Sequence, residues 1–281
     1  IAEREQLHER SELNDYTIKR LNDYFGPFDK LRDREETTKQ LNVLKTLLGS
    51  TLEELKSIVK DFGLPTFTAK QIADWLYKKR VHSIDEMTNL SQKARTALSQ
   101  EYEVGVKSPI YLSQSADGTE KYLFEVGEKR HIESVMIPEK DRSTLCISSQ
   151  IGCQMNCLFC ATGKQGYAGN LTVAEILNQV QSINHPEKLT NIVFMGMGEP
   201  LNNLDAVLKA IAIMTADYGY GWSPKRITLS TVGILPNLPA FLEKTQCHLA
   251  VSVHAPSAFE RRELIPAEKA YPINDVMTLL K

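Results

Sequence analysis

A helical pattern of apolar residues begins shortly after residue 50. Residues 51–63 read TLEELKSIVKDFG, in which Thr51 and Glu54 have the spacing of a capping box and Gly63 supplies a stop signal. The apolar positions fall on one face of the predicted helix: Leu52, Leu55, Ile58, Val59 and Phe62. The pattern therefore predicts an amphipathic helix with one buried face.

The same pattern recurs in residues 68–80, TAKQIADWLYKKR. Here we expect Thr68 and Gln71 to form the capping box, and a buried stripe follows at Ile72, Trp75 and Leu76. Shorter helical segments follow in SIDEM and SQKARTALSQEY. Together these segments predict a compact helical module over residues 46–104.

Alternation with a period of two replaces the helical pattern in residues 109–138, PIYLSQSADGTEKYLFEVGEKRHIESVMIP. Turn signals at Asp117-Gly118 and at Gly127 separate the alternating runs. We therefore predict a short antiparallel β meander over residues 105–140.

Strands and helices alternate over residues 141–281. Strands are expected in TLCISS, NIVFMGM, RITLSTVG and HLAVSVHA, and helices in VAEILNQVQSI, LDAVLKAIAIMTADY, LPAFLEKT and INDVMTLLK. Such alternation is typical of an α/β fold with a parallel sheet, either open or closed into a barrel. Functional residues in these folds gather beyond the carboxyl ends of the strands.

Composition narrows the class of protein. The chain has 281 residues and a formal net charge of −2, so contacts with nucleic acid would have to come from local basic patches. No apolar run approaches the ~20 residues of a membrane span, and the start of the chain, IAEREQLHER, lacks a signal-peptide core. Five cysteines, three of them clustered, favour metal binding in a reducing compartment over disulfides. We therefore predict a cytoplasmic protein without a membrane partner, in which residues 1–45 form a charged, unassigned lead-in.

Three cysteines follow the first predicted strand of the parallel set. Cys153, Cys157 and Cys160 form the pattern C-x3-C-x2-C. Closely spaced thiolates suit a [4Fe–4S] cluster, and three of them leave one iron open to a small-molecule ligand. A structural zinc site is the alternative, with Cys146 or His185 as the fourth ligand.

A second motif ends the next predicted strand, in VFMGMGEPLNN. Glycines at a strand end let the backbone approach a ligand closely, and the carboxylate of Glu199 can bind an ammonium group. Because the two motifs follow neighbouring strands, we expect them to face the same ligand.

In combination, these motifs resemble the radical SAM superfamily and, more closely, the RlmN/Cfr family of RNA adenine methyltransferases. The resemblance rests on TLCISSQIGCQMNCLFCATG, FMGMGEPLNN, RITLSTVGILP, SVHAP and YPINDVM, and on the upstream segment FTAKQIADWLYKKRVHSIDEMTNL. It runs from about Thr46 to Lys281. It implies a partial (βα)6 radical SAM barrel over residues 141–281, preceded by an RNA-binding helical module.

The resemblance also implies two cofactors and their ligands. Cys153, Cys157 and Cys160 would hold a [4Fe–4S] cluster, whose open iron is chelated by S-adenosylmethionine (SAM). The residues expected to bind SAM are Gly198, Glu199, Ser230, Ser252, Val253 and His254. Taken singly, the serines are as often strand-end caps, and a lone histidine is more often structural.

Two catalytic residues follow from the same resemblance. Glu133 matches the residue that removes a proton from the adenine carbon, and Cys146 matches the resolving cysteine. In the family, one SAM methylates a carrier cysteine and a second yields a 5′-deoxyadenosyl radical. The radical activates the carried methyl for addition to adenine, and the resolving cysteine then releases the product by forming a disulfide with the carrier. On the bare sequence, Cys146 is more simply a buried strand residue, and Cys247 is assigned to core packing.

The expected substrates are 23S rRNA and tRNA, methylated at adenine C2, with an electron donor such as flavodoxin as a further partner. The GEP form of the second motif favours this reading over a Cfr-type enzyme that methylates C8. A non-catalytic, zinc-containing RNA-binding protein is the alternative from another class. Candidate phosphate contacts lie in basic pairs and runs: residues 77–80, 129–130, 225–226 and 261–262.

The carrier cysteine of the family lies in a C-terminal stretch that has no counterpart up to Lys281. The last strands of the family's barrel also have no counterpart up to that residue. We therefore expect residues 1–281 to be C-terminally incomplete, and by themselves unable to methylate RNA.

Overall fold

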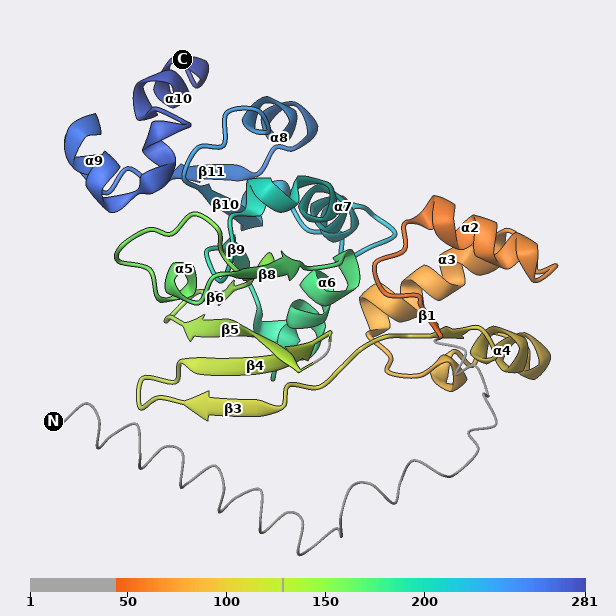
Figure 1. The fold of residues 1–281 in the computed structure, drawn as a ribbon. Helices are drawn as coiled ribbons and strands as arrows, with labels where there is room; N and C mark the ends of the chain where they lie inside the picture. Colours follow the sequence, from red (N-terminus) through yellow and green to blue (C-terminus); the bar gives the residue numbers. More distant parts are fainter. Residues whose placement is uncertain (1–43, 128) are drawn as a thin grey trace, which may run out of the picture. The chain divides into compact units, whose positions relative to one another are not determined.

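A seven-stranded sheet organises residues 44–127 and 129–281, the part of the chain that the computed structural model describes. The predicted lead-in therefore lies almost wholly outside the described residues. The strand order is β11 (His248–Val251), β10 (Ile227–Thr231), β9 (Asn191–Phe194), β6 (Ser143–Cys146), β5 (Arg130–Pro138), β4 (Glu120–Val126) and β3 (Tyr111–Gln114) (Figure 1).

The sheet is mixed. Strands β6, β9, β10 and β11 are parallel, as the alternating pattern predicts, whereas β3, β4 and β5 run antiparallel. The meander is not a separate layer, because β5 pairs antiparallel with β6 and joins the core sheet. An α/β fold is thus confirmed, with four parallel strands in the described residues.

One face of the sheet is covered by helices. The connections between parallel strands contain α6 (Val173–Gln181), α7 (Leu204–Thr215) and α8 (Leu238–Lys244). Leu145, Ile192 and Leu229 point to this face and are fully buried. Their neighbours in sequence point to the opposite face and are only half-buried, since side chains alternate along a strand. The sheet therefore keeps one open face, which carries Cys146.

The predicted helical module contains α2 (Leu52–Asp61), α3 (Phe67–Ala73), a π-helical turn η2 (Asp74–Lys79), a 3₁₀ turn η3 (Ile84–Glu86) and α4 (Gln92–Ser99). The capping box of Thr51 and Glu54 is present in both directions, and Gly63 has a left-handed backbone, with φ of 64°. A short parallel pair, β1 (Lys45–Thr46) and β2 (Tyr102–Glu103), joins the two ends of the module.

The second predicted capping box is wrong. Helix α3 begins at Phe67, two residues before the start that a cap at Thr68 implies, and Thr68 lies buried inside its first turn. Thr66 occupies the N-cap position, but its side chain makes no capping hydrogen bond. Burial of this turn in the core outweighs the local sequence preference for a cap at Thr68.

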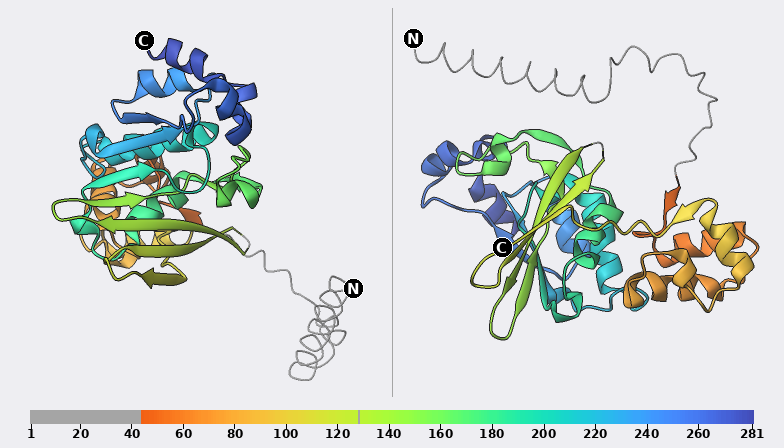
Figure 2. Two further views of the ribbon diagram at one scale, coloured as in Figure 1. Left: turned by 90° about the vertical axis from the view of Figure 1, so that its left-hand side faces the viewer. Right: turned by 90° about the horizontal axis from the view of Figure 1, so that it is seen from below.

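The helical module packs beside α6 and α7, on their side away from the antiparallel strands (Figures 1 and 2). The Gln181 side chain, at the end of α6, donates to the carbonyl of Leu76 at 2.8 Å and to the Tyr220 hydroxyl at 2.9 Å. The module and the sheet share one apolar core. Among the described residues, no helix is long and apolar enough to span a membrane.

Several short elements surround the carboxyl ends of the parallel strands. A two-stranded hairpin, β7 (Gln150–Gly152) with β8 (Tyr167–Asn170), follows β6 and was not predicted. Helix α5 (Ala161–Lys164) lies inside that hairpin. The chain ends on α9 (Ala258–Leu264), the 3₁₀ turn η7 (Pro266–Lys269) and α10 (Ile273–Leu279).

Candidate active site

The cysteine loop is the connection between β7 and β8. The Cys153 amide donates to the carbonyl of Gly166 at 2.9 Å, which closes the base of the loop. Gly152 has φ of 72°, and a Cβ there would lie 1.8 Å from the Gly166 carbonyl oxygen. Only glycine fits this close crossing. The hairpin thus holds the three cysteines at the carboxyl end of the parallel strands.

A single cavity of about 530 Å³ brings the predicted cluster and SAM residues together. The cysteine loop forms one wall, and the segments after β9, β10 and β11 form the others. Nine predicted residues line this pocket: Cys153, Cys157, Cys160, Gly198, Glu199, Ser230, Ser252, Val253 and His254.

The acid of the second motif is almost fully buried at the bottom of this pocket. Glu199 is 3% exposed, and its carboxylate accepts hydrogen bonds from the amides of Leu201 at 3.1 Å and Val232 at 2.9 Å. Burial raises the pKa of the Glu199 carboxyl above its ordinary value. A cationic group in the pocket would favour the ionised form.

The glycines of the motif are required by the protein's own packing. A Cβ on Gly196 would lie 2.7 Å from the Ile147 carbonyl oxygen. A Cβ on Gly198, where φ is 102°, would lie 2.6 Å from the Cβ of Gln150. Both glycines also line the pocket, so close approach of the backbone to a ligand stays a prediction at these positions.

Residues that the sequence reasoning missed hold the motif in place. The buried Gln150 side chain accepts from the Glu199 amide at 2.9 Å and donates to Asn170 at 2.7 Å. The buried Asn203 side chain donates to the carbonyls of Ser149 and Leu171, both at 2.8 Å. In the sequence, the only indication of these roles was the amide side chains beside the two motifs, in SSQ and PLNN.

The ends of β10 and β11 are tied together by a buried arginine. Arg261 is fully buried and forms an ion pair with Glu268, which is also buried. Its guanidinium donates to the carbonyls of Val232 at 2.7 Å and Ser252 at 3.0 Å. The hydroxyl oxygens of Ser230 and Ser252 lie 3.5 Å apart on these two strand ends. Arg261 therefore shapes the wall of the pocket from behind.

The two predicted catalytic residues lie outside this pocket. Glu133 lines a neighbouring cavity and forms an ion pair with Lys121, at 2.6 Å between Nζ and Oε1. Cys146 ends β6 on the open face of the sheet, paired in register with Val135 and Val193. Burial raises the pKa of the Cys146 thiol. Both residues belong to strands adjacent to the pocket, without being part of its lining.

Comparison with known proteins matches both halves of this architecture. Residues 147–280 match the radical SAM superfamily, and residues 45–104 match the ribosomal RNA large subunit methyltransferase N-terminal domain. The probable dual-specificity RNA methyltransferase RlmN of Bacteroides thetaiotaomicron is 60% identical over 235 residues, which cover 84% of this chain and 68% of the relative. The chain belongs to the RlmN family of radical SAM RNA methyltransferases.

One further RlmN relative and one solved structure extend the likeness. The dual-specificity RNA methyltransferase RlmN of a Marinomonas species is 42% identical over 82% of this chain and 65% of its own length. The crystal structure of a radical SAM methyltransferase from Sphaerobacter thermophilus superposes with a TM-score of 0.78 at 36% identity, covering 83% of this chain and 71% of that one. The family expected from the sequence is thereby confirmed, together with a radical SAM fold and the RlmN N-terminal domain.

The donor set in the pocket suits the iron–sulfur chemistry of the superfamily. All three loop cysteines are free thiols, and Cys153 and Cys157 are each 8% exposed. Burial, followed by the nearby charges of Glu199, Cys157 and Cys160, raises the pKa of Cys153 to about 11. Since ligation requires thiolates, loading a cluster would release protons. Within residues 44–127 and 129–281, no group of three His, Cys, Asp or Glu side chains is close enough to hold one metal ion. The three thiols therefore line the same cavity without converging on a single ion position.

Neither candidate for a fourth zinc ligand lines the pocket. His185 lies before β9, at the amino end of the parallel strands, and pairs with Glu187 at 3.1 Å. Cys146 is likewise absent from the lining. The pocket therefore presents three thiols, the number that suits a cluster with an open iron.

Some basic residues considered as phosphate contacts are already engaged. Arg261 is wrong as a candidate, because it is fully buried. Arg226 donates to the carbonyls of Leu189 and Thr190 and stacks on Trp222, at 4.4 Å from the ring centre. Lys79 lies 3.5 Å from the centre of the Trp75 ring. Intramolecular contacts thus occupy these cations.

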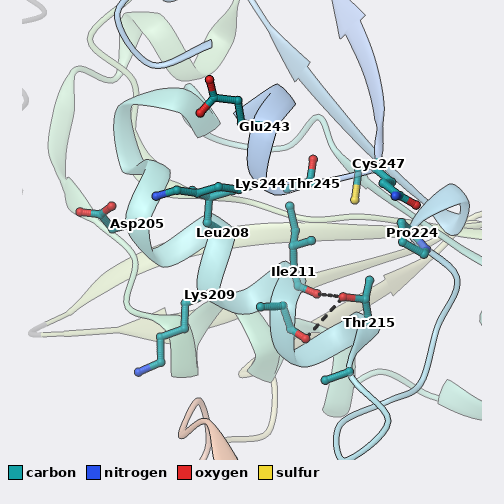
Figure 3. Close-up of a pocket in the computed structure, with 13 residues that line it drawn as sticks. Asp205, Leu208, Lys209, Ile211, Thr215, Pro224, Glu243, Lys244, Thr245 and Cys247 are labelled. Atoms are coloured by element: carbon teal, nitrogen blue, oxygen red, sulfur yellow. Dashed lines mark hydrogen bonds between the residues drawn. The ribbon is translucent and has the colours of Figure 1, made fainter. Parts of the chain in front are cut away.

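A larger cavity lies elsewhere, between α7 and α8, and contains none of the predicted site residues (Figure 3). Its volume is about 750 Å³, and Cys247 borders it. The Cys247 side chain also packs against the apolar core, and burial raises its pKa to about 11. The thiol is therefore protonated at neutral pH, in keeping with a packing role.

Proposed function

We propose that this RlmN-family chain carries the cluster site and the SAM site of an enzyme that methylates C2 of adenosine in 23S rRNA and tRNA, using SAM and a [4Fe–4S] cluster. The observation that carries the proposal is the pocket that unites three thiols, a buried carboxylate and the hydroxyls of two strand ends. The names of the relatives, dual-specificity RNA methyltransferases, support RNA as the substrate.

The pocket residues divide between the two cofactors. Cys153, Cys157 and Cys160 would hold the cluster, which would supply the electron for reductive cleavage of SAM and would itself be reduced by a donor such as flavodoxin. The Glu199 carboxylate would accept hydrogen bonds from the ammonium group of SAM, and that cation would offset the burial that raises the pKa of Glu199. Gly198, Ser230, Ser252, Val253 and His254 would line the remainder of the SAM site.

Glu133 and Cys146 would act on the substrate side. Glu133, which is ion-paired with Lys121, would accept the proton from the adenine carbon. Cys146 would release the methylated product by attacking the sulfur of the carrier cysteine, which would form a disulfide and break the bond between that sulfur and the transferred carbon. Because burial raises the pKa of Cys146, its thiol must lose a proton before it attacks.

Two measurements test the proposal. Anaerobically reconstituted chain should bind about four irons with sulfide and should bind SAM, and Cys157→Ala should lose both properties. Deletion of the native gene should remove 2-methyladenosine from 23S rRNA and tRNA in nucleoside mass spectrometry. Loss of 8-methyladenosine instead would identify a C8 enzyme, and a chain that takes up zinc but no iron would contradict the proposal.

A further inference from the structure

A second cavity adjoins the proposed SAM pocket on the side of the antiparallel strands. Its volume is about 360 Å³, within the usual range for small-ligand sites. It lies between the β4–β5 hairpin and the β7–β8 hairpin, and Gly152 and Met197 in its lining directly precede the pocket residues Cys153 and Gly198. The described residues that line it are Leu123, Lys129, Arg130, His131, Glu133, Ile151, Gly152, Gln165, Gly166, Ala168 and Met197.

The walls of this cavity differ in character. Leu123, Ile151 and Met197 offer apolar surface, which suits the face of a nucleobase. Lys129 and Arg130 supply adjacent positive charges at the exposed start of β5. Glu133 is the acid in the described lining, and Lys121 neutralises it.

The backbone and one anchoring contact hold the two cations at this position. Lys129 has a left-handed backbone, with φ of 55°, at the turn between β4 and β5. The Arg130 guanidinium donates to the Ala168 carbonyl at 2.5 Å, which links the two hairpins. Since a guanidinium has five N–H donors, Arg130 keeps donors for an anion.

We propose that Lys129 and Arg130 bind the RNA phosphates that flank the target adenosine, while its base enters the cavity toward Glu133. This inference rests on the proposed function. A base must leave its stack to be modified, and contacts to the neighbouring phosphates fix its register without reading sequence. The same cavity presents both the cations and the proposed proton acceptor, so one nucleotide can reach both.

The test is the salt dependence of RNA binding by the purified 281-residue chain, measured by fluorescence anisotropy with a labelled tRNA transcript. Each lost phosphate contact lowers the slope of log K against log salt by about 0.7 to 0.9. The double variant K129A/R130A should therefore have a less steep slope, smaller in magnitude by about 1.4 to 1.8. The matched control is K140A/R142A, which removes the same charge near the other end of β5, where Arg142 pairs with Glu139 at 3.0 Å.

The outcomes separate this inference from the proposed function. A reduced slope in K129A/R130A, with the slope of K140A/R142A unchanged, supports the phosphate site. Equal slopes for the parent and K129A/R130A overturn the phosphate site and leave the proposed function standing. A parent chain that does not bind tRNA overturns the phosphate site together with the RNA part of the proposed function.

Discussion

Burial raises the pKa of four of the five cysteine thiols and so lowers their reactivity. It raises the pKa of Cys153 and of Cys247 to about 11, and it also raises the pKa of Cys146 and Cys157. The thiolate is the form that reacts with alkylating agents, so a raised pKa slows the reaction at neutral pH. Cys153 and Cys247 are therefore a matched pair: similar acidity, with only Cys153 in the proposed cluster site.

We expect iodoacetamide at pH 7.5 to modify Cys153 and Cys247 in the cluster-free chain on the order of 100-fold more slowly than the same residues after unfolding, where the pKa is about 8.5. In the folded chain, the modification rates of Cys153 and Cys247 should each rise about tenfold per pH unit between pH 7.5 and 9.5, because the thiolate fraction rises by that factor. Peptide mass spectrometry of timed samples measures each site. Equal rates in the folded and unfolded chain would contradict the prediction.

Reconstitution with iron and sulfide should then protect only the proposed ligands. Alkylation at pH 9.5 should fall at Cys153, Cys157 and Cys160 and remain unchanged at Cys146 and Cys247, since coordinated sulfur is no longer a free nucleophile. The same mass spectrometry reads all five sites in one sample. Protection of Cys146 alongside the other three would assign it as a ligand and contradict its resolving role.

At the residue scale, the sequence predicted the convergence of the pocket because strand order alone brings the ends of parallel strands together. It could not distinguish Arg261 from Arg262, which look alike in the chain. Only the fold buries Arg261 against Glu268 and the strand-end carbonyls. Burial of a charge depends on partners that come from separate elements, and no local pattern reveals them.

At the element scale, capping decides where α6 begins. Thr172 accepts from the Glu175 amide at 3.2 Å, and Glu175 reaches back to the Thr172 amide at 2.8 Å. The helix carries Gln179, whose buried side chain binds Ser134 at 2.6 Å and the amide of Ser148 at 2.8 Å. Thr172→Ala should lower the free energy of unfolding by about 1 kcal/mol, because it leaves the Glu175 N–H in the first turn without its acceptor.

Urea denaturation followed by circular dichroism measures this change. Thr278→Ala is the matched control, since Thr278 is exposed in α10 and its hydroxyl only bonds back to the Asn274 carbonyl. That substitution should change stability by less than about 0.5 kcal/mol. A loss at position 172 no larger than at position 278 would show that the cap does not stabilise α6.

Sequence patterns located the long elements better than the short ones. The helices and strands of the parallel core fall where periodicity predicts, because most of them bury apolar side chains along one face. The β7–β8 hairpin was not predictable, since its strands, QIG and YAGN, include Gly152 and Gly169. Glycine adds no side chain to an apolar pattern, so no period emerges there.

At the scale of the whole molecule, the helical module and the sheet form one apolar core. Leu76 and Tyr77 of the module and Ile192 and Phe194 of the sheet belong to the same buried cluster. Polar contacts reinforce the junction, among them the bond from Gln181 to the Leu76 carbonyl. The sequence suggested a boundary near residue 104 because the pattern changes there, yet residues 44–281 form one compact unit. Periodicity reports local structure and cannot show which faces pack together.

We therefore expect the module and the sheet to unfold together. Leu76→Ala removes a fully buried side chain and should cost about 2 to 5 kcal/mol. If the core is cooperative, amide hydrogen exchange should accelerate by the same factor in α3 and in the most protected amides of β9 and β10, which exchange only through global opening. Phe67→Ala is the control in the same helix, because Phe67 is 63% exposed and should leave β9 and β10 unaffected. Acceleration confined to α2–α4 after Leu76→Ala would show instead that the module opens on its own while the sheet that carries the active site stays folded.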